Sequence, residues 1–143
     1  EWCLDQGIDQ ERAGRVADAI RGATFTASLD GGEQSIEGKI LHDADKLDAI
    51  GAIGIARAFA YGGKKDRPIH HQGISHELVE LSSEQYKKRG ADTAAATTAY
   101  FYEKLLQLKD RMLTTEAKKI AAQRHAFLEQ FLDEFYAEWD GQR

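Results

Sequence analysis

The chain has 143 residues, of which 42% are hydrophobic and 30% are charged, and its formal net charge is −5. This length fits a single domain with one core and excludes multidomain assemblies and long repeat arrays. The acidic balance, with no stripe of Lys and Arg, argues against nucleic acid as a partner.

Apolar runs are short and cysteine is rare. No run approaches the roughly 20 residues that a membrane span needs, so we expect a cytoplasmic protein with no membrane partner. Cys3 is the single cysteine, which excludes an intrachain disulfide and a thiolate zinc cluster. A bound metal would therefore be held by His, Asp or Glu.

The first half of the chain predicts two helical segments. Residues 10–23 carry apolar side chains at steps of three and four, which is typical of a helix with one buried face: Ala13, Val16, Ala17 and Ile20. A turn at Asp30-Gly31-Gly32 follows. Residues 36–61 form the next segment, which from Ala49 onward is apolar nearly all round and predicts a central helix enclosed by others. Gly51 and Gly54 inside it indicate close approach of a neighbouring group.

Residues 62–93 are polar and predict a long loop or lid. Ser82 with Gln85 could cap one short helix within it. We expect His70, His71 and His76 to be solvent exposed, because their spacing fits no fixed coordination pattern. Lys64 and Lys65 either attract an anionic substrate or are simply solvated.

Residues 94–141 predict an antiparallel helical hairpin. Its first helix starts at Asp92 or Thr93 and runs through Leu113, and the second starts at Thr114 or Thr115 and ends at Gly141. The second helix carries an apolar stripe of Ala117, Ala121, Leu128, Phe131, Phe135 and Trp139. Segments with the alternation of a β-strand are absent from the sequence, so the predicted fold class is all-α.

Two carboxylates stand out in the segment 40–55. If it is one helix, Asp45 and Asp48 share the face of Leu41 and Ala52 and point inward, while His42, Asp43 and Lys46 lie on an arc that reaches water. Buried carboxylates need a cation, strong donors or a water-filled cleft. The alternative is structural, with the pair capping backbone amides or pairing with a buried Arg.

Three basic residues could likewise have either a functional or a structural role. Arg124 falls inside the apolar stripe of the last helix, which predicts a pair with an interior carboxylate or a position facing a cleft. Lys109 lies between Leu106 and Leu113, where a lysine usually extends to the helix edge. Arg57 either reaches a phosphate or caps the end of its helix.

The run Ile40-Leu41-His42-Asp43-Ala44-Asp45-Lys46-Leu47-Asp48-Ala49-Ile50-Gly51-Ala52-Ile53-Gly54-Ile55-Ala56-Arg57 resembles the distal half of the HD-domain metal-dependent phosphohydrolases. It is most similar to a bacterial branch marked by a DADRLDAIGAIGIAR run. Residues 101–110 and 131–141 resemble the tail of that branch, so the resemblance covers residues 8–141. It implies a single HD-type helical bundle over residues 1–143, with the HD core helices at about 1–61.

The resemblance also implies a ligand set. In that superfamily a divalent cation, such as Mn, Mg, Ni or Co, lies between a His, a His-Asp dyad and a distant Asp. Asp45 looks like that distant Asp, whereas His42-Asp43 is not assigned as the dyad. We expect the dyad and the first His upstream of Glu1, in residues that the sequence lacks.

The implied activity is metal-dependent hydrolysis of a phosphate ester or anhydride, with nucleoside triphosphates as the first substrates to test. The cation would lower the pKa of a bound water and neutralise charge on the phosphoryl oxygens. Asp45 would hold the metal, and Asp48 would hold a water or orient a ligand. The candidate substrate-binding residues are Lys46, Arg57, Lys104, Lys109 and Arg124. The alternative is a catalytically inactive helical module that binds a nucleotide or a protein, and the last helix could serve a homodimer.

Overall fold

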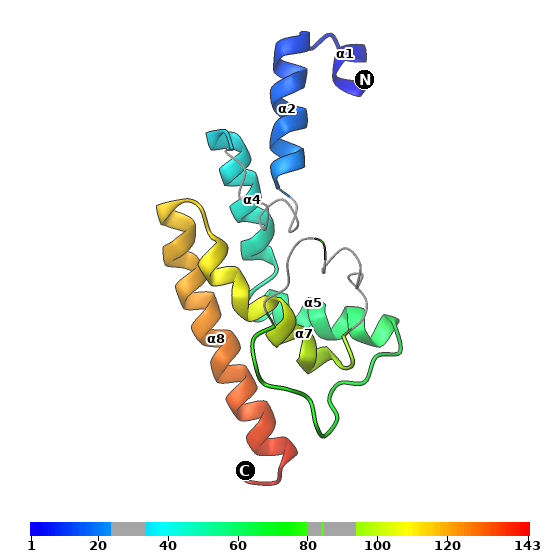
Figure 1. The fold of residues 1–143 in the computed structure, drawn as a ribbon, viewed down its shortest axis with the longest axis vertical. Coiled ribbons are helices and arrows are strands. Elements are labelled where there is room, and N and C mark those ends of the chain that lie inside the picture. The colour runs from blue at the N-terminus through cyan, green and yellow to red at the C-terminus, as the bar shows by residue number, and fades with distance from the viewer. Residues whose placement is uncertain (24–33, 80–83, 85–93) are drawn as a thin grey trace.

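A computed structural model describes residues 1–23, 34–79, 84 and 94–143. Over these ranges the chain folds into helices and contains no strand, which confirms the all-α prediction. The helices are α1 (Trp2–Asp5), α2 (Gln10–Gly22), α4 (Ile36–Asp48), α5 (Gly51–Lys64), α7 (Thr97–Glu103), the 3-10 helix η1 (Leu105–Arg111) and α8 (Thr115–Trp139) (Figure 1). Three predicted features lie outside the described residues: the turn at Asp30-Gly31-Gly32, the cap formed by Ser82 and Gln85, and the helix start at Asp92 or Thr93.

Three of these helices begin at a side-chain cap that the sequence provides. Asp9 accepts a hydrogen bond from the Arg12 amide at the start of α2, and Ser35 accepts one from the Gly38 amide at the start of α4. Thr114 accepts from the Ala117 amide at the start of α8. Short oxygen-bearing side chains satisfy the first amides of a helix in this way, so the helix starts follow from the sequence.

The core lies where α8 meets α5, α7 and η1. Figure 1 shows α8 running along the long axis of the molecule; α5 and η1 pack against it, and α7 packs against α5 and η1. The buried apolar side chains of this core include Ile55, Ala58, Phe101, Leu105, Leu108, Ala117, Ala121, Leu128 and Leu132. The predicted stripe on the last helix is therefore confirmed at Ala117, Ala121 and Leu128. Trp139 at its far end is 48% exposed, which the stripe did not predict.

The predicted helix over residues 36–61 is divided in two. α4 ends at Asp48 and α5 begins at Gly51, whose φ of +76° is a left-handed conformation that favours glycine. A Cβ at Gly51 would lie 3.0 Å from Cγ of Arg124 on α8, which confirms the predicted close approach of a neighbouring helix at this glycine. A Cβ at Gly54 would lie 2.2 Å from the carbonyl oxygen of Ala49, in the segment just before α5. The predicted enclosure of α5 is wrong for the described residues, since Ile53 is 64% exposed.

The first arm of the predicted hairpin is also broken. The backbone at Lys104 leaves the helical region at φ −145°, and the chain continues as η1 to Arg111. η1 packs against α8, while α7 turns toward α5. The continuous helix through Leu113 was therefore wrong, because apolar spacing alone does not reveal a change of helix type.

The amino-terminal helices carry apolar side chains that the described chain leaves uncovered. Val16 and Ile20 of α2 are exposed, so the prediction that they form part of a buried face was wrong. α2 lies beside α4 in Figure 1, projects above it and packs mainly against that helix. α4 in turn exposes Ile36, Ile40 and Leu41. No described helix combines the length and apolar character that crossing a membrane requires.

The loop predicted from residue 62 starts later, because α5 continues through residues 62–64. The described part of the loop after α5 is attached to α7 by hydrogen bonds and to α8 by ring contacts of His70. Ala96 has no side chain that can cap α7, and the carbonyls of Pro68 and Ile69 accept from the amides of Thr97 and Thr98 at 2.8 and 3.1 Å. His70 Nδ1 lies 2.9 Å from the Thr98 hydroxyl. His70 is half-buried, against the prediction, whereas His71 and His76 are exposed as expected.

Candidate functional site

α4 presents two chemically different faces. Its buried residues are Gly38, His42, Asp43 and Lys46, which lie on one side of the helix because they recur at steps of three and four. Asp45 and Asp48 lie on the opposite side, with side chains 64% and 63% exposed. The predicted orientation was therefore reversed.

The reversal has a structural cause. The inward orientation was predicted from a helix face shared by Leu41 and Ala52, which assumes that both belong to one helix. The break before Gly51 places Leu41 in α4 and Ala52 in α5. Leu41 is itself exposed in the described chain, so it marks the open face. Helical spacing identifies residues that share a face, and it does not identify which face is covered.

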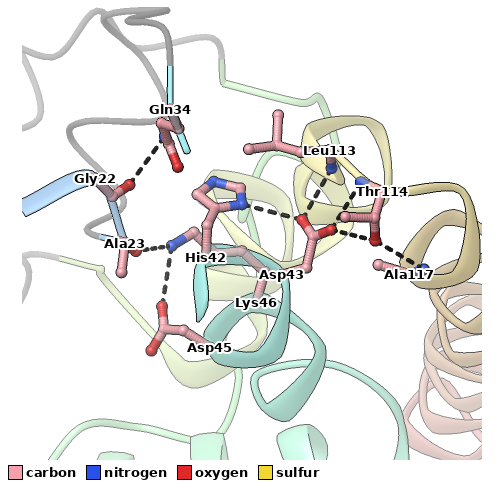
Figure 2. A network of polar contacts seen from close by, with 10 residues as sticks. All are labelled: Gly22, Ala23, Gln34, His42, Asp43, Asp45, Lys46, Leu113, Thr114 and Ala117. Carbon is pink, nitrogen blue, oxygen red and sulfur yellow. Dashed lines mark hydrogen bonds and ion pairs between the residues drawn. The ribbon is translucent and has the colours of Figure 1, made fainter. Parts of the chain in front are cut away.

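Lys46 lies inside the protein, where a solvated lysine was expected. Its side chain is 1% exposed, and its ammonium donates to the Ala23 carbonyl at 2.7 Å and to Asp45 Oδ2 at 2.9 Å. Figure 2 shows Lys46 between Ala23 and Asp45, so it joins the end of α2 to α4. In this arrangement the ammonium orients one oxygen of the Asp45 carboxylate.

Asp43 points in the other direction and binds the start of α8 (Figure 2). Its oxygens accept from the Leu113 amide at 2.9 Å, the Thr114 amide at 2.8 Å and the Thr114 hydroxyl at 2.7 Å. Burial raises the pKa of Asp43, but these hydrogen bonds and one with His42 outweigh burial and leave it below its usual value. Asp43 is therefore an ionised cap on α8.

His42 completes this buried group. Its Nδ1 lies 3.1 Å from Asp43 Oδ1, and the ring is 0% exposed. Nε2 has no hydrogen-bond partner among the described residues. The sequence pair His42-Asp43 thus acts within the helix packing, which agrees with leaving it out of the predicted dyad.

The end of α4 is held by two arginines. Arg57 of α5 forms an ion pair with the Asp48 carboxylate and donates to the Asp48 carbonyl at 3.2 Å. Arg124 of α8 donates to the Leu47 carbonyl and packs over Gly51. The prediction of an interior carboxylate or a cleft for Arg124 was wrong, because the last turn of a helix presents carbonyls that a cation can satisfy.

The five predicted substrate-binding residues do not meet at one place. Lys46 is buried on the inner face of α4, and Arg124 contacts the segment between α4 and α5. Lys109 is half-buried on η1, and the ammonium of Lys104 lies 5.7 Å from the centre of the Tyr100 ring. Arg57 alone of the five lines the cavity described next.

A cavity of about 490 Å³ lies against α5. The described residues that line it share one face of α5 or face it from beyond the helix: Ala49, Gly54, Arg57, Ala58, Ala60, Tyr61, Lys64, Arg67, Tyr100 and Leu105. We call it the α5 pocket. Sequence reasoning missed Tyr61 and Tyr100, although the steps from Arg57 to Tyr61 and Lys64 are a helical signal that could have indicated the pocket.

The described residues alone do not fit a divalent metal. Among them, no group of three or more His, Cys, Asp or Glu side chains converges. Asp45 offers one carboxylate, and Lys46 already binds one of its oxygens. A metal held through Asp45 would need further ligands from outside the described ranges.

Comparisons with known proteins show what this chain is similar to. No family model matches the chain. The YpgQ protein of Bacillus subtilis is 39% identical over 128 residues, which are 88% of this chain and 52% of YpgQ.

Solved structures give the same result. A Lactobacillus plantarum protein superposes with a TM-score of 0.79 at 36% identity, over 97% of this chain and 64% of its own. An HD-superfamily hydrolase from Bacillus thuringiensis gives 0.67 at 39%, over 97% and 59%. YpgQ in complex with ADP gives 0.67 at 34%, over 94% and 56%. This chain spans about half to two thirds of the length of these relatives, and over that span it is similar to YpgQ and to an HD-superfamily hydrolase.

Proposed function

We propose that the protein carrying this chain is a divalent-metal-dependent phosphohydrolase that acts on nucleotides. The observation that carries the proposal is the similarity, over 97% of the chain, to an HD-superfamily hydrolase. A nucleotide substrate is supported by the related YpgQ, which was solved in complex with ADP. Nucleoside triphosphates are the first substrates to test.

Asp45 is the residue that we propose as a metal ligand, with Mn, Mg, Ni or Co as the cation. Its carboxylate is exposed on the open face of α4, and Lys46 fixes one oxygen from beneath. The same face exposes Ile40 and Leu41, which are side chains that another segment would cover. The remaining ligands would come from outside the described residues.

The role that we propose for Asp48 differs from that of Asp45. It lies one turn after Asp45 and holds the Arg57 guanidinium at the edge of the α5 pocket. This ion pair matches the structural alternative for Asp48, although Arg57 is not buried. We propose that Asp48 positions Arg57 toward the substrate.

The test uses the natural protein that carries this sequence. It is incubated with a panel of nucleotides and each of the four metals, and hydrolysis is followed by chromatography. Asp45→Asn is expected to reduce metal-dependent turnover at least a hundredfold, because the carboxylate charge that holds the cation is lost. Asp110→Asn, the same change at an exposed position of η1, should retain turnover.

The result that contradicts the assignment is turnover that survives Asp45→Asn with its metal dependence intact. Circular dichroism of both variants checks that the fold is preserved, since Asp45 also contacts the buried Lys46. A variant that is folded and inactive supports the proposal.

A second candidate function is a nucleotide-binding module without catalysis. The observation that favours it is the absence of a three-ligand group from the described ranges of the chain. It predicts that ADP binds the natural protein and that no nucleotide is hydrolysed with any of the four metals.

A further inference from the structure

One face of α5 is shaped to leave a hollow. Arg57, Tyr61 and Lys64 recur at steps of four and three, so they share that face and are exposed, and the buried Gly54 and Ala58 lie beside them on the inner side of the helix. Small side chains at the base and long ones at the rim produce a concave surface. The resulting cavity of about 490 Å³ lies in the size range of small-molecule sites.

The charge of this hollow is positive. Among the described residues that line the α5 pocket, Arg57, Lys64 and Arg67 are cationic and none is acidic. Asp48 lies at the edge and contacts Nη1 of Arg57, but a guanidinium carries five N–H donors, so one carboxylate does not saturate it. The pocket therefore favours a ligand with more than one negative charge.

Aromatic rings form part of the same lining. Tyr61 belongs to α5 and Tyr100 to α7, and both line the cavity. The ammonium groups of Lys65 and Lys104 lie 5.6 and 5.7 Å from the centres of these two rings, so each ring has a cation beside it. Tyrosine rings beside cations offer a surface on which a flat heterocycle can stack.

We propose that the α5 pocket binds a nucleoside di- or triphosphate, with the phosphates at Arg57 and Lys64 and the base against Tyr61 or Tyr100. This inference rests on the proposed function and deepens it by assigning the substrate site. Asp48 joins the two, because it lies one helical turn from Asp45 and its carboxylate holds Arg57. The phosphate held at Arg57 would then lie at the end of the pocket nearer Asp45, and Lys64 would meet the ligand two helical turns further along α5.

The experiment is a titration of the natural protein that carries this chain with ADP in EDTA, followed by NMR of the backbone amides. Because EDTA removes divalent metals, the result does not depend on catalysis. ADP is expected to shift the amides of α5 and of Tyr100. Adenosine and pyrophosphate, titrated separately, should each bind at least tenfold more weakly than ADP.

Two charge reversals provide the matched variants. Lys64→Glu places a negative charge at the pocket and should weaken ADP binding at least tenfold. Lys118→Glu makes the same change on an exposed position of α8 outside the pocket, and should weaken it less than twofold. A heteronuclear spectrum of each variant reports whether it is folded.

Several results would overturn the assignment. Amide shifts confined to other helices, or equal losses in the two variants, would remove the α5 pocket as the site. Pyrophosphate that binds as tightly as ADP would remove the contact between the base and the tyrosines. Hydrolysis that depends on Asp45 together with ADP binding unaffected by Lys64→Glu would leave the proposed function standing without this pocket. ADP bound in the pocket of a protein that hydrolyses no nucleotide would leave the pocket standing without the proposed function.

Discussion

The two faces of α4 use the same residue types for opposite purposes. On the buried face, the Asp43 carboxylate receives three hydrogen bonds from the start of α8, and Lys46 binds the end of α2. On the open face, Asp45 and Asp48 are largely exposed and each contacts a single cationic side chain. The buried face thus assembles the fold, and the open face retains carboxylate oxygens that a ligand can reach.

This difference shows why the pair His42-Asp43 is a poor guide to the metal site. A carboxylate whose oxygens are already filled by backbone and hydroxyl donors is stabilised as an anion but has little capacity for a cation. Asp45 is only two residues later and about 200° away around the helix. The position on the helix, and not the identity of the neighbouring residue, separates the structural carboxylate from the candidate ligand.

The largest expected effect is at the buried carboxylate. Asp43→Ala leaves the amides of Leu113 and Thr114 and the Thr114 hydroxyl without their acceptor, and removes the cap that joins α4 to α8. We expect the free energy of unfolding to fall by about 4 kcal/mol. Urea denaturation followed by circular dichroism measures this change.

Asp48→Ala is the matched change on the open face of the same helix. It removes an exposed ion pair with Arg57, so the free energy of unfolding should change by less than about 1 kcal/mol. Equal losses in the two variants would contradict the division of α4 into a structural face and an open face.

The sequence was sufficient for the helices that start at a side-chain cap and pack along a long stripe. α8 illustrates this, since Thr114 caps it and Ala117, Ala121 and Leu128 are buried as expected. The caps and the spacing are local properties, so they are visible without the rest of the fold.

The candidate site depended on information that local patterns do not contain. The orientation of Asp45 follows from the break at Gly51 and from which neighbours cover α4, and both are tertiary features. The burial of Lys46 requires the carbonyl of Ala23, which is 23 positions away in sequence. The α5 pocket likewise needs Tyr100 from another helix.

The next largest effect compares two adjacent glycines at the end of α5. A Cβ at Gly62 would lie 2.2 Å from the Thr97 hydroxyl oxygen, whereas a Cβ at Gly63 meets nothing within 4 Å. Gly62→Ala should therefore lower the free energy of unfolding by about 2 kcal/mol, because Thr97 is itself buried and α7 must shift. Gly63→Ala should raise it by up to about 1 kcal/mol through helix propensity. Thermal denaturation of the two variants should move in opposite directions, and a shared direction would show that the α5–α7 contact is loose.

The smallest effect concerns two adjacent histidines after α5, one half-buried and one exposed. Burial, together with the positive charge of His76 and His71, lowers the pKa of His70, and Asp140 opposes this shift by raising it. The pKa of His70 is about 6.5 in the unfolded chain and lower in the folded chain, so near and below pH 6.5 the unfolded chain binds more protons at His70. The stability that His70 contributes is therefore present above about pH 6.5 and is lost as the pH falls below that value.

Protonation would place a charge beside Phe135, Tyr136 and Trp139, whose ring centres lie 5.0 to 5.9 Å from the His70 ring. Urea denaturation at pH 7.5 and pH 5.5 should show that His70→Gln loses less stability on acidification than the unmodified chain does, by no more than about 1 kcal/mol. His71→Gln, at the exposed neighbour, should keep most of the pH dependence, because burial and His76 still lower the pKa of His70. If both variants kept it, the acid sensitivity would belong to other groups, and the packing of His70 on α8 would not be the cause.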